Sequence, residues 1–328
     1  MNVVRYGIAG FGRFAERAIS PAIAASGNSR LVAIQKRSSS AAREKADEFG
    51  IPLSFGTVQE MVASPEVDAI FIVSANSTHR EETLAAARTG KHVIVEKPMA
   101  MTLAEAEEMV AACAAGRVKL MVAHMLRFSP LLIRMRQLVQ DGSIGMVLSS
   151  RADFIYDSRL SERSWLFDRA VAGGGPIFDI GVHCLDTLRY VLDDEVEEVL
   201  SFCEPPPTEQ RTESLAHLLL RFSRRSIGTI TCSFLSPIRR TYLEVLGSEG
   251  VLSAFDFTVG SRTTPLVIQR AGKGGETETR VEEIAVPNLY VEEITHFSDS
   301  IIRDRDPGPS GLNGVRNQRV LDLAMRGR

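Results

Sequence analysis

A lysine at the end of a short apolar run is the first residue of this sequence that could do chemistry. Residues 93–95 are apolar and are followed by Glu96, Lys97 and Pro98. Because proline has no backbone N–H to give to a sheet, the run is predicted to be a strand that ends there. In open parallel sheets, ligands lie beyond the carboxyl ends of the strands, so Lys97 is predicted to project toward a ligand. Glu96 and Lys97 are both candidates for contact with a cofactor.

A second group of reactive residues follows three consecutive glycines, residues 173–175. Asp179 and His183 are four residues apart, so on a helix they would lie on one face, one turn apart. Histidine has an ordinary pKa of about 6.5, which allows it to take a proton at neutral pH beside a carboxylate. The same spacing also fits Asp179 as an N-cap after the glycines and His183 as a packed core residue. The spacing alone does not choose between these interpretations.

The first strand runs directly into a glycine motif, Gly10-x-Gly12-x-x-Ala15. In the dinucleotide fingerprint the first glycine permits a tight turn, the second lets the backbone approach a pyrophosphate, and the third small residue keeps the helix close to the strand. Arg13 and Phe14 lie within this motif and are further candidates for cofactor contact. A glycine-rich turn without a ligand is the alternative, but the position after the first strand favours a dinucleotide.

The end of the second predicted strand carries two basic residues, Lys36 and Arg37, after Gln35. Domains that bind NAD usually place a carboxylate there to accept a hydrogen bond from the ribose 2′-hydroxyl. Here no carboxylate repels a 2′-phosphate, and both basic side chains could pair with one. The sequence therefore predicts NADP as cofactor, with NAD as the alternative. The other interpretation makes both residues solvated surface charges.

Small polar residues follow the fourth predicted strand, at positions 74–79, and lead into a helix. Ser74, Asn76 and His79 are candidates for contact with the nicotinamide end of the cofactor. For His79, an exposed polar role at the start of the helix is the alternative.

Short apolar runs alternate with helical patterns up to residue 124, which is typical of βαβ units around a parallel sheet. Thr57 and Thr102 are each followed three residues later by glutamate, which predicts capping boxes at two helix starts. The predicted strands are residues 3–9, 31–35, 53–55, 69–73, 92–95 and 119–124. We therefore predict a doubly wound Rossmann domain, residues 1–124, that binds NAD(P).

Beyond residue 124, strands dominate and are interrupted by few helices, so the sheet is predicted to be mainly antiparallel. The predicted strands are residues 146–154, 196–202, 215–222, 227–234, 241–246, 251–255, 266–270 and 281–286. The predicted helices are residues 130–140, the segment around Asp179 and His183, 290–303 and 314–325. Residues 125–328 are accordingly predicted to form an α+β domain, which makes the chain α/β overall.

The bulk composition excludes several classes of protein. At 328 residues the chain exceeds the usual size of one hydrophobic core, so two domains are expected. With 38 basic and 41 acidic residues and no long basic run, nucleic acid is not an expected partner. No apolar stretch approaches the roughly 20 residues of a membrane span. The four cysteines form no CxxC pair and the N-terminus resembles no leader, so we expect a cytoplasmic protein without bound metal.

The motifs together resemble those of the Gfo/Idh/MocA oxidoreductases over nearly the whole chain. The resemblance rests on these segments, in this order: residues 10–15, 90–93, 96–98, 127–128, 173–175 and 179–183. It implies an N-terminal Rossmann domain and a C-terminal domain with a large open, mainly antiparallel sheet, so that residues 125–328 would serve substrate binding and oligomerisation. It also implies a homodimer or homotetramer formed through that sheet.

The resemblance further implies a role for three residues. Lys97 would hydrogen-bond the reacting oxygen, His183 would exchange its proton, and Asp179 would help to orient the substrate. Two departures limit what can be carried over, because many relatives have tyrosine where this chain has Leu126 and arginine where it has Leu166. Contacts made by those side chains are not expected here.

The sequence thus predicts an NADP-dependent oxidoreductase that acts on a secondary alcohol or carbonyl of a sugar, polyol or related hydroxylated substrate. A non-catalytic NADP-binding regulator on the same fold is one alternative. A reductase of a bulky substrate other than a sugar, such as a cyclic diol or a tetrapyrrole, is another.

Overall fold

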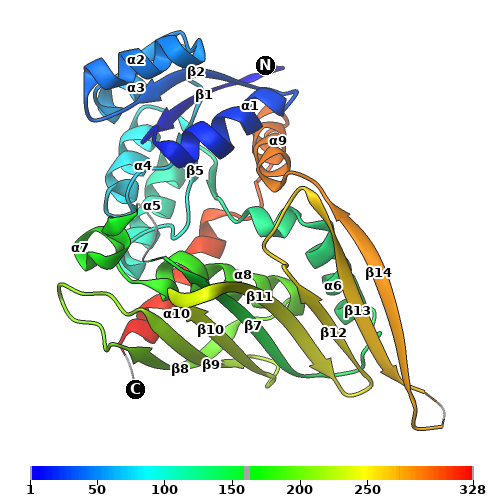
Figure 1. Cartoon of the computed structure of the whole chain (residues 1–328). Helices are drawn as coiled ribbons and strands as arrows, with labels where there is room; N and C mark the ends of the chain where they lie inside the picture. The colour runs from blue at the N-terminus through cyan, green and yellow to red at the C-terminus, as the bar shows by residue number, and fades with distance from the viewer. Residues whose placement is uncertain (1, 159–162, 273, 327–328) are drawn as a thin grey trace. The chain divides into compact units, whose positions relative to one another are not determined.

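The chain packs into two compact units, which the computed structural model describes over residues 2–158, 163–272 and 274–326. The first unit comprises Met1–Met125 and Tyr290–Gln318, and the second comprises Leu126–Leu289 and Arg319–Arg328. The ribbon in Figure 1 follows the chain from one unit into the other. The chain therefore returns to the first unit at residue 290. The prediction had assigned all residues from 125 onward to the second domain.

The first unit is built on a sheet of six parallel strands in the order β3-β2-β1-β4-β5-β6. The predicted doubly wound sheet is confirmed. The strands are β1 (Val4–Ala9), β2 (Ser29–Gln35), β3 (Leu53–Phe55), β4 (Ala69–Ile72), β5 (His92–Val95) and β6 (Leu120–Val122). All four residues of β4 are buried, as are the last three of β5. This burial explains why both strands read as continuous apolar runs rather than alternating ones.

Helices cover both faces of this sheet. Met61 of α3 and Met109 of α5 belong to the core on one face, whereas Ile23 of α1 and Phe297 of α9 belong to the core on the other. Tyr6 of β1 also reaches α9, with its hydroxyl 2.7 Å from Ser298 Oγ. The helices and turns of this unit are η1 (Ala15–Ile19), α1 (Ser20–Ala25), α2 (Ser39–Phe49), α3 (Val58–Ala63), η2 (Asn76–Thr78), α4 (His79–Arg88), α5 (Leu103–Ala115), α9 (Leu289–Ile302) and most of α10 (Gly311–Met325).

Local hydrogen bonds fix the start of two of these helices. At α3 the capping box is complete, because Thr57 accepts from the backbone of Glu60 and the Glu60 carboxylate accepts from the backbone of Thr57. At α5 the Thr102 side chain accepts from the backbone of Glu105. The Glu105 carboxylate instead accepts from Met101, one residue before the cap, at 2.9 Å. Both predicted helix starts are therefore present. At the second, the glutamate accepts from the residue before the N-cap rather than from the N-cap residue itself, as it would in a standard capping box.

The second unit is built on an eight-stranded sheet in the order β14-β13-β12-β11-β7-β10-β9-β8. Neighbouring strands are antiparallel except for the parallel pair β7 and β10, so the mainly antiparallel prediction is confirmed. The strands are β7 (Val147–Asp157), β8 (Val196–Glu204), β9 (Leu215–Phe222), β10 (Ile227–Ser233), β11 (Leu235–Gly247), β12 (Gly250–Phe255), β13 (Arg262–Ala271) and β14 (Thr277–Val286).

Several strands are longer than their sequence pattern predicts. The clearest case is β11, whose pairing with β7 shifts between Leu235 and Arg240. Pro237 lies in this irregular stretch, where a proline can be accommodated because the regular ladder is interrupted. Because a proline argues against a strand, the prediction began this strand only at residue 241 and missed its first half.

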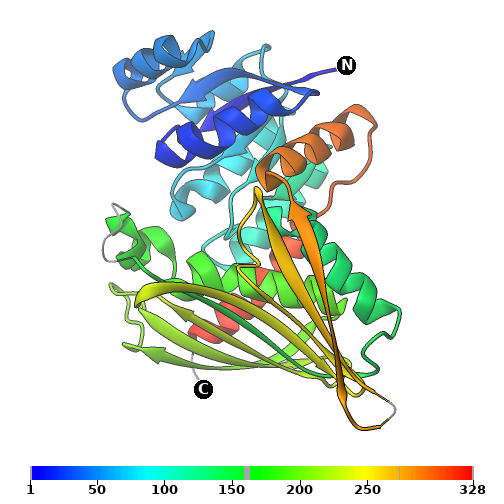
Figure 2. The same ribbon diagram turned by 45° about the vertical axis from the view of Figure 1, so that its right-hand side comes forward.

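One face of the second sheet is covered by helices and the other is open. Residues of β9 alternate between buried and exposed along its length, as expected for a sheet with one packed face. Figure 2 shows α8 lying along the covered face, where its Cys184, Leu185 and Leu188 are buried. The remaining elements are η3 (Met125–Phe128), α6 (Pro130–Gln140), η4 (Ser164–Phe167), α7 (Arg169–Ala172), η5 (Ile177–Gly181) and α8 (Val182–Leu192). None of the helices in the described ranges is both long enough and apolar enough to cross a membrane.

Candidate functional site

Glycine occurs at positions 10 and 12, after β1, for different reasons. Gly10 has φ +79°, and a Cβ placed on it would lie 2.7 Å from Ser74 Cα, so the fold itself requires glycine. Gly12 is exposed, and a Cβ on it would meet only the carbonyl oxygen of Gly10, at 3.9 Å. Nothing inside the protein excludes a side chain at position 12. The open backbone there is what a bound pyrophosphate requires.

The chain turns into a helix immediately after Gly12. Glu16 donates its backbone N–H to the carbonyl of Gly12 at 2.9 Å, and Ala15–Ile19 is wound as a π-helix. Arg13 and Phe14 are exposed in the first turn, where Phe14 packs edge-on against Tyr290 with 5.6 Å between ring centroids. Unpaired N–H groups at a helix start carry partial positive charge and favour phosphate. Arg13 and Phe14, both predicted to contact the cofactor, lie at this helix start.

The residues at the end of β2 support the glycine turn. The Gln35 side chain accepts from the backbone of Gly10 and donates to Gly56, each at 3.1 Å. Lys36 donates its Nζ to the carbonyl of Phe11 at 2.6 Å, so its amine braces the turn. Arg37 is exposed, and among the described residues its side chain makes no hydrogen bond or ion pair. The two basic residues, predicted as a pair, thus have different surroundings.

The segment after β4 forms a hydrogen-bonded loop. Ser74 donates its hydroxyl to Glu82 Oε2 at 2.5 Å and accepts from Thr78 at 2.8 Å. Burial raises the pKa of Glu82 to about 7. Asn76 is buried at the start of η2. This loop also supplies the backbone against which Gly10 packs.

Lys97 follows β5 and is half-buried, with its backbone N–H donated to Glu96 Oε2 at 3.2 Å. Glu96 itself donates its backbone N–H to Ile72, the last residue of β4, at 2.9 Å. His79 is fully buried, with Nδ1 3.0 Å from the Pro98 carbonyl oxygen and Nε2 3.2 Å from that of Ser74. The structure thus brings the predicted residues of the glycine turn, the serine loop and the lysine motif to one edge of the first sheet.

In the second unit, Asp179 lies inside η5 and its carboxylate faces two other side chains. Tyr156 donates its hydroxyl to Asp179 Oδ2 at 3.0 Å, and two nitrogens of Arg163 lie 3.3 Å from the two carboxylate oxygens. Arg163 also donates to the Tyr156 hydroxyl at 2.7 Å. Asp179 is therefore not a helix N-cap, and it is held by an arginine and a tyrosine.

Tyr156 and Arg163 were not predicted from the sequence. The strand that carries Tyr156 was predicted to end at residue 154, and Arg163 lies in a segment without a clear pattern. Burial, followed by the nearby Asp179 carboxylate, raises the pKa of Tyr156, so its hydroxyl stays protonated and remains a donor. The alternation of β7 offered a weak signal, because Phe154 and Tyr156 fall on the same face.

His183 lies in the first turn of α8 and is half-buried. Its ring lies 6.1 Å from that of Phe154, measured between centroids. The segment before it, Ile177–Gly181, is wound as a π-helix, in which the hydrogen bond spans five residues and the turn is wider. The four-residue spacing from Asp179 therefore covers less than a full turn, so the simple one-face argument for these two residues holds only approximately.

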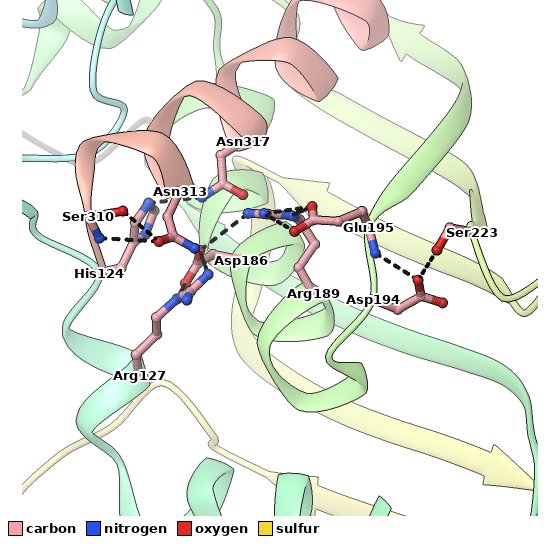
Figure 3. A network of polar contacts seen from close by, with 10 residues as sticks. All are labelled: His124, Arg127, Asp186, Arg189, Asp194, Glu195, Ser223, Ser310, Asn313 and Asn317. Atoms are coloured by element: carbon pink, nitrogen blue, oxygen red, sulfur yellow. Dashed lines mark hydrogen bonds and ion pairs between the residues drawn. The ribbon is translucent and has the colours of Figure 1, made fainter. Parts of the chain in front are cut away.

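A network of ion pairs, largely buried except at Glu195, fixes α8 beyond His183 (Figure 3). Arg127 makes two parallel hydrogen bonds to Asp186, at 2.8 and 2.9 Å, and Arg189 bonds the Glu195 carboxylate. Arg189 Nη1 also lies 3.8 Å from Asp186, whose side chain is 3% exposed. Two-point contacts between arginine and a carboxylate restrict orientation as well as distance. They hold the helix that presents His183.

Comparison with known proteins decides the family. The NAD-binding Rossmann domain of the Gfo/Idh/MocA oxidoreductase family matches residues 4–124, and the family's C-terminal domain matches residues 132–253. The chain belongs to the Gfo/Idh/MocA family. It is therefore a dehydrogenase or reductase with a nicotinamide cofactor.

Individual members of the Gfo/Idh/MocA family match over different lengths. The 1,5-anhydro-D-fructose reductase of Ensifer adhaerens is 32% identical over 312 residues, which cover 95% of this chain and 92% of the reductase. The trans-1,2-dihydrobenzene-1,2-diol dehydrogenase of Mus musculus is 31% identical over 222 residues, or 68% of this chain and 65% of that enzyme. The crystal structure of the aldose-aldose oxidoreductase of Caulobacter crescentus, complexed with glycerol, is 29% identical, covers 99% of this chain and 98% of that one, and has a TM-score of 0.87.

The residues of the glycine turn fit the nicotinamide dinucleotide that the Gfo/Idh/MocA fold binds. The backbone at Gly12 is open, the helix start lies beside it, and Lys36 and Arg37 supply positive charge. In the part of the chain that the structure describes, no three His, Cys, Asp or Glu side chains gather in a way that would hold a metal ion.

The contrast between the two glycines is testable by alanine substitution. Gly12→Ala should leave the thermal unfolding midpoint nearly unchanged, because nothing in the protein meets the new methyl group, and should weaken NADPH and NADH binding by about tenfold or more. Gly10→Ala should lower the free energy of unfolding by about 1–3 kcal/mol, because positive φ and a close backbone contact both oppose it. Unfolding scans and titrations of nicotinamide fluorescence measure the two effects. Unaltered cofactor affinity in Gly12→Ala would contradict the placement of the dinucleotide.

Proposed function

We propose that this protein is an NADP-dependent oxidoreductase that interconverts a secondary alcohol and a carbonyl in a sugar, polyol or related hydroxylated substrate. The observation that carries the proposal is the convergence of Gly10, Ser74 and Lys97 at the carboxyl edge of one parallel sheet. That edge is where such folds bind nicotinamide and the atom that reacts with it. The names of the relatives, which include a reductase of an anhydro sugar and an aldose oxidoreductase, support the substrate class.

We assign the first unit to cofactor binding and the residues around Asp179 and His183 to the substrate. When bound, the nicotinamide supplies or accepts the hydride. Lys97 polarises the reacting oxygen through its ammonium group, and His183 exchanges the proton of that oxygen. Asp179 is held by Arg163 and Tyr156, so its role is to orient hydroxyl groups of the substrate rather than to take a proton. The four cysteines are free, which supports a reducing, cytoplasmic setting.

Substitution of the two proposed catalytic residues tests the reaction. Lys97→Met and His183→Ala should each reduce kcat by at least about 100-fold. The first removes the positive charge that polarises the reacting oxygen, and the second removes the group that exchanges its proton. Affinity for NADPH should stay within about threefold of the parent, because the glycine turn is untouched. Steady-state kinetics over a panel of polyols, aldoses and their carbonyl forms, with NADPH titration, provide both readouts.

Matched controls separate catalysis from general disturbance. Lys91→Met changes the lysine at the amino end of the same strand, and His217→Ala changes an exposed histidine of β9. Both should turn over substrate at nearly the parent rate. Near-normal rates in Lys97→Met or His183→Ala would overturn the assignment, and NADPH binding without turnover across the panel would favour the non-catalytic regulator.

The cofactor preference depends on the two basic residues after β2. Arg37 is exposed, which supports a role in pairing with a 2′-phosphate, whereas Lys36 donates its amine to the Phe11 carbonyl. We therefore expect Arg37→Gln to lower kcat/KM for NADP about tenfold or more while leaving that for NAD unchanged. Lys36→Gln should weaken both cofactors, because it loosens the glycine turn. Initial rates with each cofactor decide the point, and a parent enzyme that uses NAD equally well would refute the preference.

We further propose that the open face of the second sheet joins copies of this chain into a homodimer or homotetramer. Exposed apolar side chains lie along this face, among them Phe202 at 77% exposed, Phe255 at 58% and Leu200 at 47%. Leu200 and Phe202 lie on the edge strand β8 and Phe255 on β12, and large apolar side chains left exposed on a sheet are candidates for burial at an interface.

A charge placed on this face tests the assembly. Phe202→Glu should shift the mass measured by light scattering toward the monomer, because a carboxylate buried at an apolar interface is costly. Val3→Glu, at an exposed apolar residue of the first unit, is the control and should leave the mass unchanged. A parent protein that is already monomeric at micromolar concentration would refute the proposal.

A further inference from the structure

His79, at the start of α4, is surrounded by protein on all sides and is 0% exposed. Its two ring nitrogens face two backbone carbonyls from different loops, Pro98 at 3.0 Å and Ser74 at 3.2 Å. The residue was predicted to contact the cofactor. Both ring nitrogens face carbonyl oxygens of the protein.

The two carbonyls belong to the segments on which the proposed chemistry depends. Pro98 directly follows Lys97, and Ser74 supplies the backbone that packs against Gly10. Ser74 also bonds Glu82, one turn along the same helix as His79. The imidazole ring of His79 therefore lies between Ser74, whose backbone packs against Gly10, and Pro98, which follows Lys97.

The ring is neutral and can donate only one hydrogen bond. Burial lowers the pKa of His79 to about 4, and the nearby Lys97 ammonium adds to this lowering. A neutral imidazole has one N–H, so only one of the two carbonyls receives a proton. Nδ1 is the closer nitrogen to its carbonyl, which favours the tautomer that donates to Pro98.

We propose that His79 is a positioning residue that fixes the backbone next to Lys97 by donating Nδ1–H to the Pro98 carbonyl, while its unprotonated Nε2 faces the Ser74 carbonyl oxygen and donates no hydrogen bond to it. The inference rests on the proposed catalytic role of Lys97. It assigns His79 no contact with substrate. A buried hydrogen bond to the neighbouring residue limits how far the lysine can move from its reactive position, and a displacement of about 1 Å can cost about 100-fold in rate.

Two amide substitutions distinguish the nitrogens. In His79→Asn the amide nitrogen can take the place of Nδ1 and donate to Pro98, whereas in His79→Gln it can take the place of Nε2 and donate to Ser74. We expect His79→Asn to keep kcat within about threefold of the parent and His79→Gln to reduce it by about 10- to 100-fold. KM for NADP should change little in either, and unfolding scans confirm that both variants are folded at the assay temperature.

The reactivity of the lysine gives a second readout that needs no substrate. The rate at which acetic anhydride modifies Lys97, followed by mass spectrometry and compared with Lys91 in the same sample, should change at least about threefold in His79→Gln and hardly at all in His79→Asn. If the parent protein turns over no substrate, the proposed function fails, but this labelling comparison still tests His79. Equal effects of the two variants, or a larger effect of asparagine, would overturn the inference.

Discussion

The parallel alignment of β1, β4 and β5 is the constraint on which the cofactor side of this protein depends. It ends three strands at one edge, so the residues that follow them meet although they are far apart in the sequence. The close approach of Gly10 to the Ser74 backbone makes this edge tight, because a single methyl group at Gly10 would collide with it. The Glu96 backbone then bonds Ile72, which fixes the lysine loop to the same edge. Small residues at the turn and an apolar run in each strand are both consequences of this packing.

In the second unit, hydrogen bonds and ion pairs hold polar side chains in place on the helical segment that covers the sheet. Asp179 is surrounded by the donors of Tyr156 and Arg163, so its charge is compensated where it is buried. One and two turns beyond His183, Asp186 and Arg189 form ion pairs with Arg127 and Glu195. Removing one member of such a network would leave a buried charge without its partner, which is the costly outcome. The helix that carries His183 is thus held by charge pairs as well as by its apolar face.

The sequence predicts well those features that depend on neighbours along the chain. The strand before Pro98, the glycine motif after the first strand and the threonine at the start of α3 each carry their signal within a few residues, and each is present. Features that depend on distant packing were missed. The sequence pattern of α9 says that it is a helix, but not that Phe297 packs on the first sheet. Arg163 resembles any surface arginine until the fold brings it to Asp179, and the burial of His79 depends on two loops that its own segment does not reveal.

Two segments of this chain are wound as π-helices, which a sequence pattern based on α-helices does not predict. The chain forms a π-helix at Ala15–Ile19, directly after the glycine turn, and another at Ile177–Gly181, which contains Asp179. π-Helical turns are rare, and they occur frequently at functional sites. At Asp179 the wider turn changes the direction of the carboxylate relative to a regular helix, and its observed partners are Tyr156 and Arg163. A periodicity of 3.6 residues cannot reveal this change, because it assumes regular α-helical winding, and Ile177–Gly181 is wound as a π-helix.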